Sequence, residues 1–218
     1  MKKKTTALLL TAAMIAVTLT GCGDTGSGNG SGASSDSAGN VTEYKVGIVQ
    51  YVDDASLNQI VAAVQAELDA KGKELGVTFN YADYTYNGQA DSTTMNQIAT
   101  DLIASEVDIV VPVATPTAMV MQNATAENPK ADGSLIPIVF SAVSDPVGAG
   151  LVAGMDAPGS NITGTSDALN TDAVFDLMFA VNPNIDTVGL LYDKSQDSST
   201  AAIAAAKAYC EKIGVAVV

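Results

Sequence analysis

The chain has 218 residues, and its 24 acidic against 10 basic side chains give a formal net charge of −14 at pH 7. It contains no histidine and no arginine, which excludes Ser-His and Cys-His catalytic pairs as well as histidine metal sites. An acidic surface also repels nucleic acid. We therefore expect a protein that is not an enzyme, needs no metal or other cofactor, and has no nucleic-acid partner.

The first 21 residues have the order of a secretory signal peptide. Residues 2–4 are lysines, residues 7–17 form a short apolar run, and small residues lead to Cys22. The ending Leu19-Thr20-Gly21-Cys22 indicates a lipobox, with cleavage before Cys22 and a diacylglycerol on its thiol. A cleaved signal with an incidental cysteine and a short membrane anchor are the alternatives. We expect a protein anchored by lipid to the extracytoplasmic face of the cell membrane.

The next segment, residues 22–41, predicts a linker. Residues 23–40 are almost wholly Gly, Ser, Asp, Asn, Ala and Thr, a composition that cannot bury enough apolar surface to order itself. We therefore divide the chain into a signal peptide (1–21), a lipidated cysteine with a flexible linker (22–41), a first ligand-binding lobe (42–163) and the start of a second lobe (164–218).

Strands and helices alternate from Tyr44 onward. Apolar runs predict strands at residues 44–50, 77–81, 107–113 and 136–140. Helical spacing predicts helices that end near Gly76, that start after Asp91 or Ser92, and that cover residues 117–126. Thr115-Pro116 and Ser144-Asp145-Pro146 each read as a cap followed by proline, which starts a helix. This alternation is typical of a doubly wound α/β fold.

The pattern starts again after a short segment at residues 161–165, which we interpret as a crossing to the second lobe. A helix is expected on the apolar positions Val174, Leu177, Met178 and Val181. A strand at 188–192, a helix at about 198–213 and a strand at 215–218 follow. Cys210 falls on an apolar helix position and predicts a small core residue. Because the chain stops inside a strand, we interpret it as truncated.

Ligands of open parallel sheets bind beyond the carboxyl ends of the strands. The polar residues expected there supply hydroxyls, amides and carboxylates without an activated nucleophile, which suits hydrogen-bonded capture of a small molecule. Thr115 and Asp145 could instead be helix caps, and Tyr51 and Tyr192 ordinary rim aromatics. The candidate ligand-binding residues are Gln50, Tyr51, Thr115, Pro116, Thr117, Ser141, Ser144, Asp145, Ser166, Asp167, Tyr192 and Ser198.

Several stretches resemble the substrate-binding lipoproteins of one ABC-importer family, whose members include tryptophan- and tyrosine-binding proteins. They are KVGIVQ at 45–50, NQIA at 96–99, ATPTA at 114–118 and IPIVFSAVSDPV at 136–147. The resemblance implies a type I periplasmic-binding-protein-like fold with two α/β lobes that close over a ligand. It also implies that roughly the last third of the family's length is missing here.

The resemblance implies the extracytoplasmic binding component of an ABC importer, which captures an amino acid-like or aromatic metabolite and docks on a permease with its ATPase. The alternative is a lipid-anchored sensor or receptor subunit that signals to a membrane partner without transport. Neighbouring genes for a permease and an ATPase would distinguish the two.

Overall fold

The computed structural model describes residues 42–194 and 197–218. The predicted signal peptide, Cys22 and the linker therefore lie outside the described residues. Within the described part of the chain, no helix is both long enough and apolar enough to cross a membrane.

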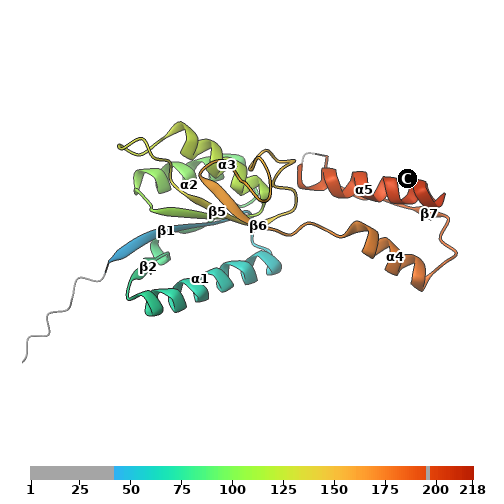
Figure 1. Cartoon of the computed structure of the whole chain (residues 1–218), viewed down its shortest axis with the longest axis horizontal. Coiled ribbons are helices and arrows are strands. Elements are labelled where there is room, and N and C mark those ends of the chain that lie inside the picture. Colours follow the sequence, from blue (N-terminus) through green and yellow to red (C-terminus); the bar gives the residue numbers. More distant parts are fainter. Residues whose placement is uncertain (1–41, 195–196) are drawn as a thin grey trace, which may run out of the picture. The chain divides into compact units, whose positions relative to one another are not determined.

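A parallel sheet forms the centre of the first α/β unit (Figure 1). Strand β1 (Glu43–Gln50) pairs with β2 (Thr78–Asn80) along its first half and with β3 (Thr85–Asn87) along its second half. A short 3-10 helix, η1 (Ala82–Tyr84), separates β2 from β3. On its other side β1 pairs with β4 (Ile109–Val113), then β5 (Ile138–Val143) and β6 (Ile162–Ser166) follow in order.

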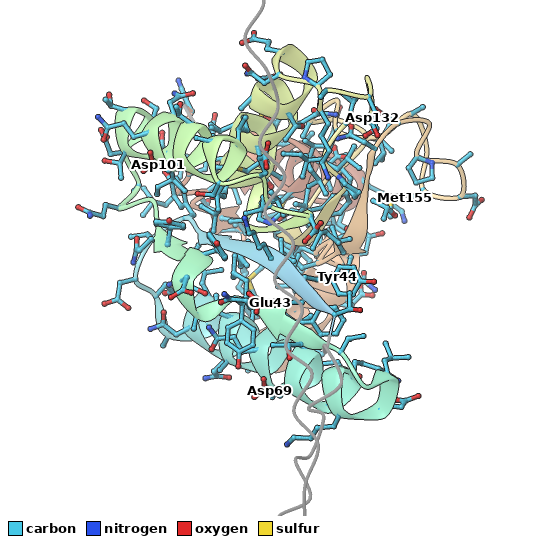
Figure 2. All side chains as sticks on the ribbon, turned by 90° about the vertical axis from the view of Figure 1, so that its left-hand side faces the viewer. Glu43, Tyr44, Asp69, Asp101, Asp132 and Met155 are labelled. Carbon is cyan, nitrogen blue, oxygen red and sulfur yellow. The ribbon has the colours of Figure 1, made fainter. Side chains whose placement is uncertain are left out.

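Helices cover both faces of this sheet. Helix α1 (Ala55–Leu75) lies on one side, and α2 (Ser92–Ala104) and α3 (Thr115–Glu127) lie on the other (Figures 1 and 2). Figure 2 shows Asp69 of α1 and Asp101 of α2 on opposite sides of β1. The fold-class prediction of a doubly wound α/β layer structure is confirmed.

The alternation of side chains along β1 produces two apolar clusters. Val46 and Ile48 pack with Val61 of α1, whereas Val49 packs with Ile98 and Leu102 of α2. Successive residues of a strand point to opposite faces, so a strand that is apolar throughout needs a helix layer on each side. That requirement explains the near-continuous apolar runs of β1 and β4.

Two helix starts and one helix end follow the expected local rules. The Asp54 carboxylate accepts from the amides of Ser56 and Leu57, and that of Asp91 accepts from the Thr94 amide at 2.7 Å. These backbone hydrogen bonds lower the pKa of both carboxyls. Gly76, with φ of 68°, ends α1 in the left-handed conformation.

The second unit contains two helices and a small sheet. Helices α4 (Thr171–Val181) and α5 (Asp197–Ile213) pack together, and β7 (Thr187–Val188) pairs in parallel with β8 (Ala216–Val217). Phe175 stacks on Tyr209 with ring centroids 5.1 Å apart. The Tyr209 hydroxyl donates to Asp176, which raises the pKa of Tyr209 to about 12. Cys210 is a buried free thiol, as predicted.

The structure corrects several sequence expectations. Residues 146–150 form turns and not the helix expected after Ser144-Asp145-Pro146. Residues 162–166, which were expected as a short crossing segment, form β6, the edge strand of the first sheet, after which the chain continues to α4. The strand expected at 188–192 shortens to Thr187–Val188.

The expected core face of α4 is wrong at three of its four positions and right at Met178. Val174, Leu177 and Val181 are exposed, whereas Phe175 is buried and Met178 and Phe179 pack against the core. Nearly every face of this helix carries apolar residues, so spacing alone could not select the face that meets α5.

Candidate functional site

The order of the strands reverses at a point where open α/β sheets commonly bind ligands. The chain adds strands outward from β1 in one direction through β2 and β3, and in the other through β4, β5 and β6. At this reversal, loops from neighbouring strands diverge and leave space beyond the carboxyl ends. The reversal lies between the end of β1 at Gln50 and the end of β4 at Val113, which are register partners.

Several hydrogen bonds hold the end of β1 at Gln50 and the next residue, Tyr51. The buried Gln50 amide donates to the Val52 carbonyl and to Asn58 of α1 at 2.6 Å. Backbone amides of the loop after β3 donate to the carbonyls of Gln50 and Tyr51. The Gln50 amide group therefore holds the end of β1 against the start of α1. Tyr51, just beyond the carboxyl end of β1, is half-buried.

Thr115 does not cap helix α3, which corrects the cap interpretation. It is the first helical residue, Ala114 precedes it, and no side chain caps the helix. The Thr115 hydroxyl oxygen is buried and has no hydrogen-bond partner among the described residues. Pro116 follows in the first turn, and the buried Thr117 hydroxyl points to the Met95 sulfur at 3.7 Å. A buried unpaired hydroxyl costs stability.

Backbone strain accompanies these strand ends. Ala114 has φ of 84° and ψ of 154°, and Ala142 has φ of 55°, both regions that non-glycine residues rarely adopt. The Ala114 amide donates to the carbonyl of half-buried Ser141 at 2.9 Å, and the pairing of β5 with β6 is irregular between Phe140 and Val143. Strain of this kind costs on the order of 1–3 kcal/mol per residue and clusters at functional sites.

The loop after β5 holds the candidate residues Ser144 and Asp145. One carboxylate oxygen of Asp145 accepts from the Gly148 amide at 2.8 Å. A Cβ at Gly148 would lie 2.1 Å from the other carboxylate oxygen, so only glycine leaves room for the side chain to fold back in this way. The Asp145 carboxylate therefore stabilises a turn and is not a helix cap.

Ser166 and Asp167 join the end of β6 to this loop. The Ser166 hydroxyl donates to the Ser144 carbonyl at 3.3 Å and accepts from the Ala168 amide at 3.2 Å. The amide of the exposed Asp167 donates to the Val143 carbonyl. These bonds hold the chain beside β5 as far as Ala168, after which Leu169 and Asn170 lead to α4.

A cavity of about 640 Å³ lies beside the loop after β5, within the range of about 300–1,000 Å³ typical of small-molecule sites. Its polar residues come from this loop, from the start of α4, from the segment between β7 and α5, and from the first turn of α5, and its apolar residues come mainly from α5. The lining comprises Ser144, Asp145, Ala168, Leu169, Thr171, Leu191, Tyr192, Ser198, Ser199, Ala201, Ala202, Ile203 and Ala205.

Four of the candidate residues thus share one cavity: Ser144, Asp145, Tyr192 and Ser198. The Lys207 ammonium lies 5.8 Å from the centre of the Tyr192 ring, a favourable cation–π geometry. The remaining candidates do not line this cavity; Gln50, Tyr51, Thr115, Pro116, Thr117 and Ser141 lie at or next to the ends of β1, β4 and β5, and Ser166 and Asp167 at the end of β6. Their ligand contacts stay predictions.

Sequence reasoning missed Leu169 and Thr171. The only signal for Leu169 is a single large apolar residue in a polar stretch, and Thr171 follows Asn170, whose side chain caps α4. The alanines of α5 gave no signal, because their small side chains fit a core equally well.

The groups on the described lining of the cavity can bind a small molecule through hydrogen bonds and apolar contacts. Its described lining offers hydroxyls, one carboxylate and apolar side chains, without a nucleophile beside a base. No group of three metal-binding side chains occurs among the described residues.

Comparisons with known proteins agree with such a role. The family described as ABC transporter substrate binding protein matches residues 45–218. The Tyrosine-binding protein of Clostridioides difficile (strain R20291) is 30% identical over 212 residues, covering 96% of this chain and 58% of that protein.

Solved structures are similar as well. An ABC domain in complex with L-Trp from Streptococcus pneumonia is 32% identical with a TM-score of 0.70, over 81% of this chain and 56% of that chain. A type 1 periplasmic binding protein from Bordetella pertussis Tohama I shares the fold at 15% identity and a TM-score of 0.54, over 80% of this chain and 46% of that chain.

The chain spans a little over half the length of the tyrosine-binding and L-Trp-bound relatives. The predicted two-lobed, type I periplasmic-binding-protein-like fold is confirmed by these likenesses. With most of its length matched by the family, the chain belongs to the ABC transporter substrate-binding proteins.

Proposed function

We propose that this protein is the extracytoplasmic, lipid-anchored substrate-binding component of an ABC importer. It captures an amino acid-like or aromatic metabolite by closure of two lobes and delivers it to a permease with its ATPase. The observation that carries the proposal is the cavity of about 640 Å³, which has polar groups on several elements and no catalytic pair among its described lining.

The class of ligand is supported by relatives and by the cavity. One relative is a tyrosine-binding protein, and another was solved in complex with L-Trp. The cavity lining includes the apolar side chains of Leu169, Leu191 and Ile203 and the aromatic ring of Tyr192. Leu169 and Leu191 are exposed. An aromatic amino acid has both kinds of surface.

The anionic group of the ligand is proposed to bind at the start of α3. Helix N-termini attract anions, and neither arginine nor histidine is present to replace them. A second helix start, after Ser144-Asp145, does not exist in the structure. Thr115 has an unused hydroxyl at α3. In the proposal Ser144 and Ser166 assist, while Gln50 and Tyr51 contact the rest of the ligand.

Calorimetric titration of the protein with the common amino acids tests the binding proposal. We expect saturable binding of an aromatic amino acid and a rise of the melting temperature with ligand concentration, because a ligand that binds only the folded state stabilises it. Absence of binding by every amino acid would contradict the proposed ligand class.

Cell fractionation tests the anchor. Cys22→Ala removes the only thiol that the predicted lipobox offers for acylation, so the variant should leave the membrane fraction while its melting temperature stays unchanged. A variant that stays in the membrane fraction would show that a different element anchors the protein.

A further inference from the structure

The apolar layer between helix α1 and the sheet opens to solvent at the amino end of the sheet. Leu68, Gly72 and Leu75 lie at positions i, i+4 and i+7 of α1 and therefore share one face of the helix. Leu68 packs in the same cluster as Phe79 of β2, and Gly72 lies against Val77. Leu75 continues this face but is 62% exposed. The last turn of α1 thus carries the apolar stripe out into solvent.

The start of β1 adds aromatic side chains to this opening. Tyr44 of β1 and Phe79 of β2 are register partners, and their rings stack with centroids 5.8 Å apart. Tyr44 is 40% exposed, and Figure 2 faces this end of the molecule and shows it at the start of β1. A cavity of about 370 Å³ lies beside Phe79, between the last turns of α1 and β2. We call Tyr44, Leu75 and Phe79 the entry surface.

The chain enters the folded unit at this same end. β1 begins at Glu43, directly after the predicted linker. The 19 residues from 23 to 41 have a composition for which the average span is roughly 22–26 Å. The eight residues of β1 extend over about 26 Å. A lipid on Cys22 would therefore keep the entry surface within reach of the membrane, while the carboxyl ends of the strands lie one strand length farther away.

The charges around the entry surface favour a zwitterionic membrane. Lys71 and Lys73 are exposed near the end of α1, and Lys73 forms no ion pair among the described residues. Lysine stems cover apolar surface while their ammonium groups reach polar headgroups. Three carboxylates near this end accept hydrogen bonds from neighbouring side chains: Glu43 from Asn80, Asp69 from Tyr81 and Glu74 from Lys71. With more carboxylates than lysines, this end does not attract an anionic bilayer.

We propose that the entry surface contacts the headgroup region of a zwitterionic lipid bilayer. Tyrosine suits this region because its ring is apolar and its hydroxyl is polar. The inference rests on the proposed lipid anchor and adds an orientation to it. The amino end of the sheet faces the membrane, and the carboxyl ends, with the proposed ligand site, lie on the side away from it. A free ligand then reaches the cavity without crossing the membrane surface.

Fluorescence quenching by lipid measures this orientation. The acylated protein is reconstituted in phosphatidylcholine vesicles that contain spin-labelled lipid, with a dye on Ala70→Cys or on Ala55→Cys. Both alanines are exposed on α1, and their separation of 15 residues places them about 22 Å apart along the helix. Cys210 is buried and does not compete for the dye. We expect lipid to quench the dye at position 70 at least about twofold more than the dye at position 55, because only a group at the interface meets the spin labels.

The double variant Tyr44→Ser, Leu75→Ser removes two apolar groups of the entry surface. In this variant, quenching at position 70 should fall to the level seen at position 55. Leu177→Ser is the matched control, because Leu177 is 67% exposed, close to the 62% of Leu75, but lies on α4. It should leave both values unchanged. Melting temperatures of the variants show whether the fold is retained.

The lipid composition tests the occupant. Replacing part of the phosphatidylcholine by phosphatidylglycerol should not strengthen quenching at position 70, since the carboxylates repel an anionic surface. Stronger quenching would overturn the zwitterionic assignment. A difference between the two dyes that occurs in native membranes but not in pure lipid vesicles would overturn the lipid assignment and would show that a protein covers the entry surface.

The outcomes separate the contact from the anchor. If the protein stays on the vesicles and both dyes are quenched alike, the membrane contact is overturned while the proposed anchor stands. If the protein does not stay on the vesicles, the anchor fails, and the membrane contact is overturned with it.

Discussion

The two α/β units follow the same alternation of strand and helix but bury very different amounts of apolar surface. In the first unit, helices cover both faces of the sheet, and Ile48, Leu102 and Phe140 are almost completely buried. In the second unit, the buried cluster consists of Phe175, Ala206 and Cys210, while other apolar side chains are exposed. Because apolar burial provides most of the stabilisation, the first unit should dominate the stability of the described chain.

This difference has a consequence for the site. Ser144 and Asp145 follow the last well-packed strand, β5, and hydrogen bonds from Ser166 and Gly148 hold their loop. Ser198 and Ser199 lie in the first turn of α5, which belongs to the less buried unit. One wall of the cavity is thus well ordered before a ligand arrives, and the opposite wall depends on weaker packing.

The largest expected effect on stability comes from replacing a buried phenylalanine by alanine, which can be done in each unit. Phe140→Ala should lower the free energy of unfolding by about 3–5 kcal/mol, since a fully buried aromatic leaves a cavity. Phe175→Ala should cost clearly less, because its neighbours Phe179 and Tyr209 are only partly buried. Urea unfolding followed by two spectroscopic probes measures both losses. Equal losses would remove the distinction between the units.

Thr115→Val tests whether the buried Thr115 hydroxyl in the first unit contributes to ligand binding. The hydroxyl has no described partner, so its removal should not lower the melting temperature. Affinity for the ligand should fall about 5- to 150-fold, as for a lost hydrogen bond of about 1–3 kcal/mol.

Thr125→Val is the control on the same helix, because the Thr125 hydroxyl donates to the Gln122 carbonyl at 3.2 Å. It should lower stability by about 0.5–1.5 kcal/mol without changing affinity. If Thr115→Val binds like the parent, Thr115 is not a ligand contact.

Acid should act on the first unit through its helix caps. The folded-state pKa values of Asp54 and Asp91 lie below the ordinary value of 3.8, so the stabilisation is present above about pH 4 and is lost as the pH falls through the lowered values. Urea midpoints between pH 2 and 6 should therefore fall at the acid end. In the double variant Asp54→Asn, Asp91→Asn, the urea midpoint should depend less on pH. An unchanged dependence would show that other carboxyls cause the acid sensitivity.

The smallest expected effect concerns the exposed face of α4. Leu177 is 67% exposed, so Leu177→Ser in the 218-residue chain should change the free energy of unfolding by less than about 0.5 kcal/mol. It should also lower binding of a dye that fluoresces on apolar surfaces. A large loss of stability would show that this face is covered in solution.

Sequence reasoning predicted most of the first unit because its signals are local. Gly76 ends α1, Asp91 caps α2, and the apolar run of β4 demands cover on both faces. The errors lie where local patterns are ambiguous. Ser144-Asp145-Pro146 has the composition of a helix start, but the Asp145 carboxylate accepts a hydrogen bond from the Gly148 amide and stabilises a turn.

The candidate site was harder to predict than the fold. Ser144, Asp145, Tyr192 and Ser198 come together in one cavity, but only Ser144 and Asp145 follow the end of a strand directly, and Leu169 and Thr171 near the start of α4 were missed. The positive φ of Ala114 and Ala142 could not be read from the sequence, because alanine itself disfavours it. Which face of α5 lines the cavity depends on tertiary packing, which periodicity does not determine.

In the proposed site, three alanines of α5 would limit the size of the ligand. Ala201, Ala202 and Ala205 line the cavity, whereas the neighbouring Ala206 belongs to the buried cluster. A mutation that enlarges one of the first three would shrink the space for a ligand without overfilling the core, and it could be reversed in one step. New specificities could therefore evolve on this helix through a series of stable intermediates.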